Sequence, residues 1–398
     1  MVREDARLRS LRASTRISWE PLRIRSPTSE HPGWYACFPV TGWTPAITGE
    51  DPMHIPDGYI SPATALAYWG GILPFWYIAS QRLRRLLVGR TVPALALFSA
   101  FVFVVMMFNV PVPGGTTAHA VGSVLAAIVL GPWAAIVATS VALIVQALFF
   151  GDGGILAIGA NCFILGVAMP LAGYGIYRLI AGSSPLESRR RVIAAAAAGY
   201  FGINVAALLV GLTLGVQPLL WSENGRALYS PYGLEVAVPA MLIPHLTVAG
   251  LAEGIVTAAG LTLVHRFSPE VLGSVPSQVP TAARQRSLIL LITAVLVLLT
   301  PLGLVASGAA WGEWSAEELE QLVGYVPSGL ARWEGWWRAP LPDYSLPWMP
   351  ESASFSEQAL AYVLSAIIGI GLVSALIFGL RLLLQPRSPE DRSAASAR

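Results

Sequence analysis

The stretch VIAAAAAGYFGINVAALLVGLTL, residues 192–214, contains no charged side chain and follows directly after Arg191. A helix needs roughly 17–25 mainly apolar residues to cross the hydrocarbon core of a bilayer. Inside lipid, a helix also satisfies its backbone hydrogen bonds within its own segment. This stretch therefore predicts a membrane-spanning helix.

Runs of the same kind recur along the 398-residue chain, which is 55% hydrophobic and only 12% charged. Soluble domains contain about 25% charged residues, so the deficit indicates lipid as the solvent. The third run is short, as is typical of a helix buried inside a bundle. We expect an all-α fold, a polytopic membrane helical bundle, with spans at about 64–80, 92–112, 118–130, 132–150, 155–180, 192–214, 234–264, 288–308 and 358–384.

The arginines predict an orientation, because basic residues favour cytoplasmic loops. They concentrate in the loops 81–91, 181–191 and 265–287 and in the C-terminal tail, whereas residues 309–357 hold two Arg against eight Asp and Glu. This alternation predicts a multi-pass protein of the inner (plasma) membrane, with its N-terminus outside and its C-terminus in the cytoplasm.

Residue types that are rare or absent exclude several classes of site. All 25 basic residues are Arg. The phosphate-binding loop of ATPases requires a Lys, so any ATPase that acts together with this chain must be another subunit. Two cysteines, Cys37 and Cys162, give no basis for a disulfide framework or a Cys-based zinc site.

Composition divides the chain into five segments. Residues 1–52 form a polar leader that lacks the apolar core of a secretory signal; they are either a disordered tail or an extension upstream of the true start. After it we expect a seven-helix membrane domain at 53–265, a cytoplasmic linker at 266–287, a two-helix C-terminal membrane module at 288–384 and a cytoplasmic tail at 385–398.

The loop 309–357 of the C-terminal module is rich in tryptophan, a residue that favours the membrane–water boundary. We favour an interfacial anchor for this loop, and a lid over an external site is the alternative. The tryptophans concerned are Trp311, Trp314, Trp333, Trp336, Trp337 and Trp348.

Candidate metal ligands begin at Met53-His54, before the turn Pro56-Asp57-Gly58. Inside a longer chain one His before such a turn is unremarkable. If Met53 is the first residue, however, its amine, the next amide nitrogen and the His54 Nδ1 can close two fused chelate rings on one metal. A fourth nitrogen would complete the square-planar set that suits Ni(II) or Cu(II).

His119 follows the stretch Gly114–Ala118, at the expected outer end of the span 118–130. The topology places it on the same side of the membrane as His54, as a shared site requires. Near a helix end a His is often only a satisfied polar group, but an ionisable side chain at membrane depth favours a function.

Six motifs, in order along residues 53–265, resemble the CbiM/NikM family, the substrate-binding (S) components of energy-coupling factor transporters for cobalt and nickel. Residues 288–384 resemble the two extra helices of its longer members. The motifs are MHIPDGYISP (53–62), GTTAH (115–119), LGPWA (130–134), QALFFGDGG (146–154), GAN (159–161) and HLTVAGLAEG (245–254).

The resemblance implies a seven-helix S-component fold whose amino-terminal segment is tucked into the bundle. It implies a transported Co²⁺ or Ni²⁺ held by the Met53 amine, the amide and imidazole of His54, and His119, with no prosthetic group. It also implies partners: a transmembrane coupling (T) subunit and two cytoplasmic ABC ATPases. The chain departs from the family in the 52 residues before Met53, so we expect the true start at Met53, and in Cys162–Leu165, where related chains tend to carry a further Asn.

Four further polar residues fall within the apolar runs: Asp152, Asn161, His245 and Glu253. Metal-bound imidazoles usually donate their second N–H to a carboxylate or carbonyl, so these residues are candidates for supporting His54 or His119. In the alternative interpretation Asp152 caps the turn Gly151–Gly154, and His245 and Glu253 stabilise packing within the last span of the seven-helix domain.

Two other functions are weaker alternatives. A stand-alone secondary transporter commonly has inverted repeats, and no convincing repeat is present. An intramembrane metalloenzyme would need three clustered ligands, yet the chain has no His-Glu-x-x-His pattern. We therefore expect a transport subunit and not an enzyme. The sequence does not decide whether the transported metal is cobalt or nickel.

Overall fold

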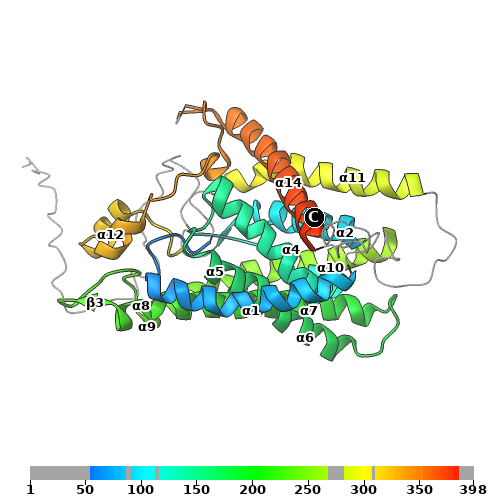
Figure 1. Cartoon of the computed structure of the whole chain (residues 1–398), viewed down its shortest axis with the longest axis horizontal. Helices are drawn as coiled ribbons and strands as arrows, with labels where there is room; N and C mark the ends of the chain where they lie inside the picture. The colour runs from blue at the N-terminus through cyan, green and yellow to red at the C-terminus, as the bar shows by residue number, and fades with distance from the viewer. Residues whose placement is uncertain are drawn as a thin grey trace, which may run out of the picture. The chain divides into compact units, whose positions relative to one another are not determined.

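The computed structural model describes residues 54–86, 91–112, 116–267, 282–306, 310–350 and 352–384, which all belong to one structural unit. Most of them are helical, and the long helices lie side by side (Figure 1). The expected class, a polytopic helical membrane protein, is confirmed. Met53, the predicted leader 1–52, most of the predicted linker 266–287 and the predicted tail 385–398 lie outside the described residues.

Within residues 54–267, every predicted span contains a helix. Three long helices contain π-helical stretches, labelled η2 to η4. The helical elements are α1 (Pro62–Leu86), α2 (Thr91–Met106), α3 (Ser123–Leu130), α4 (Pro132–Val145) with η2 (Gln146–Phe150), α5 (Ile158–Asn161) with η3 (Cys162–Ala168) and α6 (Met169–Ala181), α7 (Arg189–Gly215), α8 (Gln217–Leu220), and α9 (Leu234–Pro244) with η4 (His245–Ala249) and α10 (Gly250–Phe267).

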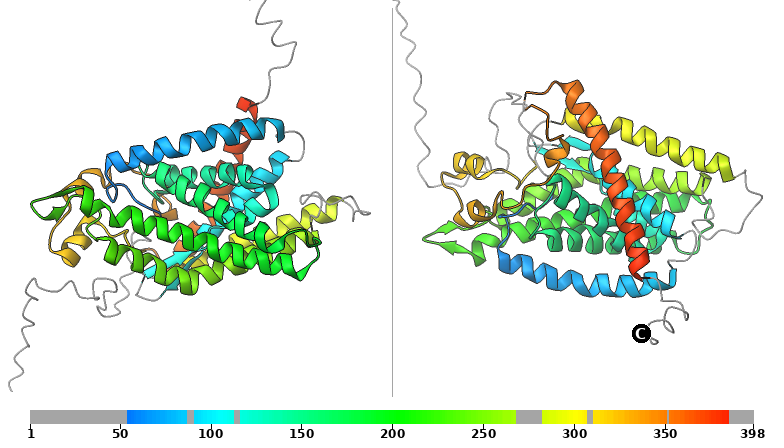
Figure 2. Two further views of the ribbon diagram at one scale, coloured as in Figure 1. Left: turned by 90° about the horizontal axis from the view of Figure 1, so that it is seen from below. Right: turned by 45° about the horizontal axis from the view of Figure 1, so that its top comes forward.

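The C-terminal module starts with α11 (Ala282–Leu299) and the 3₁₀ stretch η6 (Thr300–Val305), and it ends with α14 (Phe355–Leu384). Helix α14 crosses the bundle obliquely and packs on α2 and α4 (Figure 2). Residues 310–350, here called the connecting segment, lead to α14. They contain the short helices α12 (Ala316–Val323), α13 (Ser328–Trp333) and η7 (Pro342–Tyr344).

Five helical stretches among the described residues are long and apolar enough to cross a membrane. Two further apolar helices, Val92–Met106 and Leu291–Val305, are shorter. A crossing at every predicted span therefore stays a prediction. The five are Pro132–Phe150, Ile158–Ala181, Arg189–Leu220, Leu234–Phe267 and Phe355–Leu384.

The expected helix 118–130 is wrong in its first part, and the expected helix 92–112 is wrong in its last. β1 (Asn109–Val112) and β2 (Thr116–His119) form an antiparallel hairpin that pairs His119 with Asn109. Helix α2 stops before this hairpin because a proline such as Pro111 cannot continue the backbone bonding of a helix. Helix α3 starts only after Gly122, whose φ of 76° is left-handed. His119 thus lies on a strand and not at a helix end.

Small residues let α7 approach its neighbours α6 and α10 closely. A methyl group on Gly199 would lie 2.8 Å from the carbonyl oxygen of Glu253, and one on Gly173 would lie 2.9 Å from that of Ala198. Ala194, Ala198 and Gly199 are buried within the protein. The small-residue surface of α7 around these positions is therefore internal packing.

Gly173 and Gly175, two residues apart on α6, allow a matched test of this packing. The added methyl of Gly173→Ala would meet Val124 at 2.7 Å, whereas that of Gly175→Ala would have no atom within 4 Å. Overpacking of a tight interface costs about 1–3 kcal/mol. We expect Gly173→Ala to lower the free energy of unfolding in detergent by that amount. Gly175→Ala should be neutral or slightly stabilising, and equal effects of both changes would contradict the packing described.

Candidate metal centre

The segment His54–Ser61 is irregular backbone buried within the protein, immediately before α1. His54 is only 3% exposed. Ile55 donates its N–H to the Asn161 side chain (3.2 Å), and its carbonyl accepts from Asn161 Nδ2 (3.1 Å) and from the Gly154 N–H (3.0 Å). These bonds fix the backbone that carries the His54 imidazole.

Asp57 holds the turn of the same segment. Its carboxylate accepts the N–H groups of residues 155–157 at 2.8–3.3 Å and the indole N–H of Trp336 at 2.7 Å. Burial raises the pKa of Asp57, and these hydrogen bonds oppose that shift. Gly58 follows with a φ of 93°, and a Cβ there would lie 2.8 Å from the Leu330 carbonyl oxygen. The turn Pro56-Asp57-Gly58 therefore connects the segment before α1 with residues 155–157 and with the connecting segment.

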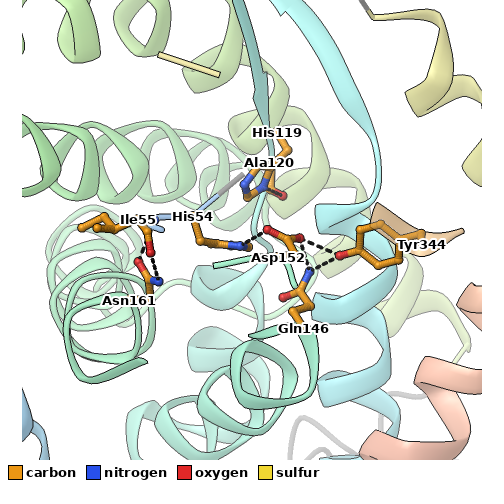
Figure 3. A network of polar contacts seen from close by, with 8 residues as sticks. All are labelled: His54, Ile55, His119, Ala120, Gln146, Asp152, Asn161 and Tyr344. Atoms are coloured by element: carbon orange, nitrogen blue, oxygen red, sulfur yellow. Dashed lines mark hydrogen bonds and ion pairs between the residues drawn. The ribbon is translucent and has the colours of Figure 1, made fainter. Parts of the chain in front are cut away.

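The His54 imidazole is oriented by Asp152 (Figure 3). Its Nδ1 lies 2.6 Å from Asp152 Oδ1, and its Nε2 is buried without a hydrogen-bond partner. Because an ionised carboxylate only accepts hydrogen bonds, Nδ1 carries the proton and the lone pair lies on Nε2. A buried nitrogen with a lone pair and no donor is a candidate ligand for a metal ion.

His119 faces His54, with the ring centroids 5.2 Å apart and the planes at 65°. Its Nδ1 donates to the Ala120 carbonyl at 2.9 Å, so the lone pair of this ring also lies on Nε2. Metal–imidazole bonds are about 2.0–2.1 Å long. Two rings in contact can therefore direct one nitrogen each at a single ion.

Both imidazoles line one cavity, and His245 lines it too. His245 starts the π-helical stretch η4, and its Nδ1 donates to the Met241 carbonyl at 2.7 Å. Short π-helical stretches inside α-helices often occur at functional sites. Residues 310–313 of the connecting segment, among them Trp311 and Glu313, also line the cavity.

Glu253 supports His119 through the backbone. Its carboxylate is fully buried and accepts the N–H groups of Val121 (2.7 Å) and Gly122 (3.1 Å), just after strand β2. It also accepts from Thr257 at 3.5 Å. The structure thus places Glu253 behind the turn that follows His119, not against His245.

Of the predicted supporting residues, Asp152 contacts a His directly. Asn161 and Glu253 act on the backbone of residues 55 and 121–122, and His245 reaches the same cavity from another wall. The sequence interpretation missed Gln146 and Tyr344, which both bond to Asp152 Oδ2. A signal for Gln146 existed, since it is a polar residue in an apolar run; nothing in the sequence marked Tyr344.

The tryptophans of the connecting segment bear on the two interpretations of residues 309–357, an interfacial anchor or a lid over an external site. Trp311 is buried and lines the cavity, and the indoles of Trp336 and Trp337 donate to Asp57 and to the Leu148 carbonyl. Trp348 is 77% exposed, as an anchor at the membrane boundary would be. Trp311 lies where a lid would, whereas the partners of Trp336 and Trp337 are not part of the cavity lining, so the anchor and the lid both stay predictions.

Within the described residues, no group of three or more His, Cys, Asp or Glu side chains could hold a metal ion. His54 and His119 therefore need further ligands of another kind to complete a coordination sphere around one ion. The predicted amine of Met53 belongs to a residue outside the described part of the chain.

Two family models match the chain. Residues 54–271 match the family model "Cobalt uptake substrate-specific transmembrane region" (CbiM), and residues 285–386 match the PDGLE domain. The chain belongs to the CbiM family. Members of this family carry the names of transport proteins, as expected for a transport component and not an enzyme.

Relatives of this CbiM-family chain include fused proteins. It is 47% identical over 350 residues to the fused nickel transport protein NikMN of Rhodobacter capsulatus, covering 83% of this chain and 99% of that protein. It is 30% identical over 273 residues to the cobalt transport protein CbiM of Geobacter sulfurreducens, covering 66% and 74%. The crystal structure of a truncated transition metal transporter shares 49% identity at a TM-score of 0.51, covering 54% of this chain and 99% of that one.

The role of Glu253 can be tested with Glu253→Gln. The new amide would turn an N–H₂ towards one of the backbone N–H groups at residues 121 and 122 and leave a donor unpaired. A buried unsatisfied group costs about 1–3 kcal/mol, so we expect a loss of that size in the free energy of unfolding and weaker metal retention. Glu320→Gln, on exposed α12, is the control and should change neither quantity.

Proposed function

We propose that this chain is the substrate-capture subunit of an energy-coupling factor importer for Co²⁺ or Ni²⁺. The observation that carries the proposal is the meeting of His54 and His119 in one cavity, with Asp152 bonded to the first ring. Further support comes from the nickel and cobalt transport names of the relatives.

In the proposed ligand set, the metal is bound by the Met53 amine, the amide nitrogen and imidazole of His54, and His119. This set requires a mature chain that starts at Met53. Support comes from the absence of a third His, Cys, Asp or Glu ligand among the described residues. The Met53 amine and the His54 amide nitrogen can complete the ligand set because both are only a few covalent bonds from the His54 imidazole.

Chelation by the His54 residue uses Nδ1, which here donates to Asp152. For Nδ1 to face the metal and Nε2 to face Asp152, the ring has to turn about both its Cα–Cβ and its Cβ–Cγ bonds, because a half-turn about Cβ–Cγ alone would place Cδ2 opposite the carboxylate. Asp152 could then accept the N–H of a metal-bound imidazole, the arrangement common around metal sites. The same carboxylate therefore serves the empty and the loaded ring.

For transport, we infer that the ion enters from outside and exchanges its water for the nitrogen ligands. The chain has no Lys for a phosphate-binding loop, so the proposed energy source is a pair of cytoplasmic ABC ATPases joined through a transmembrane T subunit. Movement of the whole capture subunit would then release the ion inward.

In this proposal the protein lies in the inner membrane, with its N-terminus outside and its C-terminus in the cytoplasm. Uptake without co-expressed ATPases would instead indicate a secondary transporter.

Replacing either imidazole tests the ligand set. We expect His54→Ala and His119→Ala each to abolish retention of Ni²⁺ or Co²⁺ through purification, measured by elemental analysis, while the detergent-solubilised protein stays folded. His265→Ala is the control, since His265 lies at the end of α10 and does not line the cavity. Normal loading of a variant would remove that residue from the set.

The free α-amine of Met53, as a proposed metal ligand, provides a second test. A chain starting at Met53 should retain metal, and the same chain with its α-amine acetylated should lose it, because an acetylated nitrogen no longer supplies the amine ligand. Intact-mass measurement of the loaded native protein should give a start at Met53. A loaded form that begins at residue 1 and keeps the leader would contradict the amine ligand.

A further inference from the structure

The connecting segment is bonded to the end of α4 next to Asp152. The Trp337 indole donates to the Leu148 carbonyl at 3.2 Å, and the Leu341 N–H donates to the Phe149 carbonyl at 2.9 Å. These carbonyls lie in η2, at the C-terminal end of the helix, where backbone acceptors lack partners within the helix. The C-terminal module therefore satisfies a helix end that lies just before Asp152.

Tyr344 extends this contact into the metal site (Figure 3). Its hydroxyl donates to Asp152 Oδ2 at 2.6 Å and accepts from Gln146 Nε2 at 2.9 Å, while Gln146 Nε2 also donates to Asp152 Oδ2 at 3.2 Å. The three groups form a closed triangle in which every bond has a proper donor and acceptor. With Oδ2 held by two donors, Oδ1 is left facing His54.

Tyr344 itself is tightly placed. Its ring is buried, stacks on Phe150 at 4.9 Å between centroids, and lies edge-on to Tyr362. Its carbonyl accepts from the Ser365 hydroxyl of α14 at 2.7 Å. Burial and the charge of Asp152 raise the pKa of Tyr344 well above its usual value, so the phenol keeps the proton that it donates.

The backbone at this point is strained. Asp343 and Tyr344 have φ values of 51° and 57°, which residues other than glycine rarely adopt. Such conformations persist where the surrounding contacts over-determine them, and they concentrate at functional sites. Here the strain brings the phenol to a carboxylate 192 residues away in the sequence.

We propose that Tyr344 is a positioning residue of the metal site, through which the C-terminal module fixes the Asp152 carboxylate against the His54 imidazole. The module is thereby a structural part of the metal centre and not only a membrane attachment. This inference rests on the proposed function, because it assumes that His54 binds the ion.

Tyr344→Phe removes one hydroxyl from the triangle and keeps the ring packing. Without the Tyr344 hydrogen bond to Oδ2, the carboxylate is held less firmly and His54 loses part of its fixed orientation. Loss of such supporting groups weakens metal affinity about 10–100-fold, and we expect a loss in that range for Ni²⁺ bound by the mature protein that starts at Met53, measured by competition with a chelator. The visible absorption of the Ni²⁺-loaded variant should also shift, because it reports ligand geometry.

The matched control is Tyr325→Phe. The Tyr325 hydroxyl accepts the Ala227 N–H at 3.1 Å, so this change also removes a hydrogen bond between the connecting segment and the bundle, but away from Asp152. We expect wild-type affinity and an unchanged spectrum. Equal losses in both variants would mean that attachment of the segment, and not the orientation of Asp152, is what matters, which overturns the proposal.

A double-mutant cycle makes the test specific. In an Asp152→Asn background, Tyr344→Phe should cause little further loss of affinity, because both changes act through the same carboxylate. Additive losses, or wild-type behaviour of Tyr344→Phe alone, would overturn the role of Tyr344. Failure of the wild-type chain itself to retain metal would instead overturn the proposed function.

Discussion

Irregular backbone inside a membrane protein has to find all its hydrogen-bond partners within the protein, because lipid offers none. The segment His54–Ser61 lies under this constraint. Asn161 pairs with both polar groups of Ile55, the Tyr59 carbonyl accepts the Ser230 N–H at 3.0 Å, and the Ser61 N–H donates to Gln217 at 3.0 Å. These partners come from widely separated parts of the sequence, so the site can form only when the bundle is complete.

The same constraint explains the buried acids. Asp57 and Glu253 accept backbone N–H groups at turns, and each turn carries or supports one imidazole. Hydrogen bonds to an ionised carboxylate are about twice as strong as neutral ones, which suits positions where a turn must not move. Direct contact with a ring is made by the third acid, Asp152.

Apolar runs predicted the helices well, because burial in lipid leaves a signal in local composition. They failed at residues 109–119, where prolines, glycines and pairing between Thr116–His119 and Asn109–Val112 override the apolar character. His54 and His119 could be singled out because ionisable groups are costly within a membrane. Tyr344 could not, since a tyrosine in a polar loop is common and its contact with Asp152 depends on the folded C-terminal module.

Charge balance gives a reason for the arrangement around the proposed site. Amine and imidazole ligands are neutral, so a divalent ion bound to them and to one deprotonated amide keeps one positive charge. A buried charge is costly unless it is paired. Asp152, 2.6 Å from the His54 ring, supplies one negative charge without occupying a ligand position. Two donors on its other oxygen, Tyr344 and Gln146, keep that charge satisfied when the cavity is empty. The site can thus alternate between loaded and empty states without leaving a buried charge unpartnered in either.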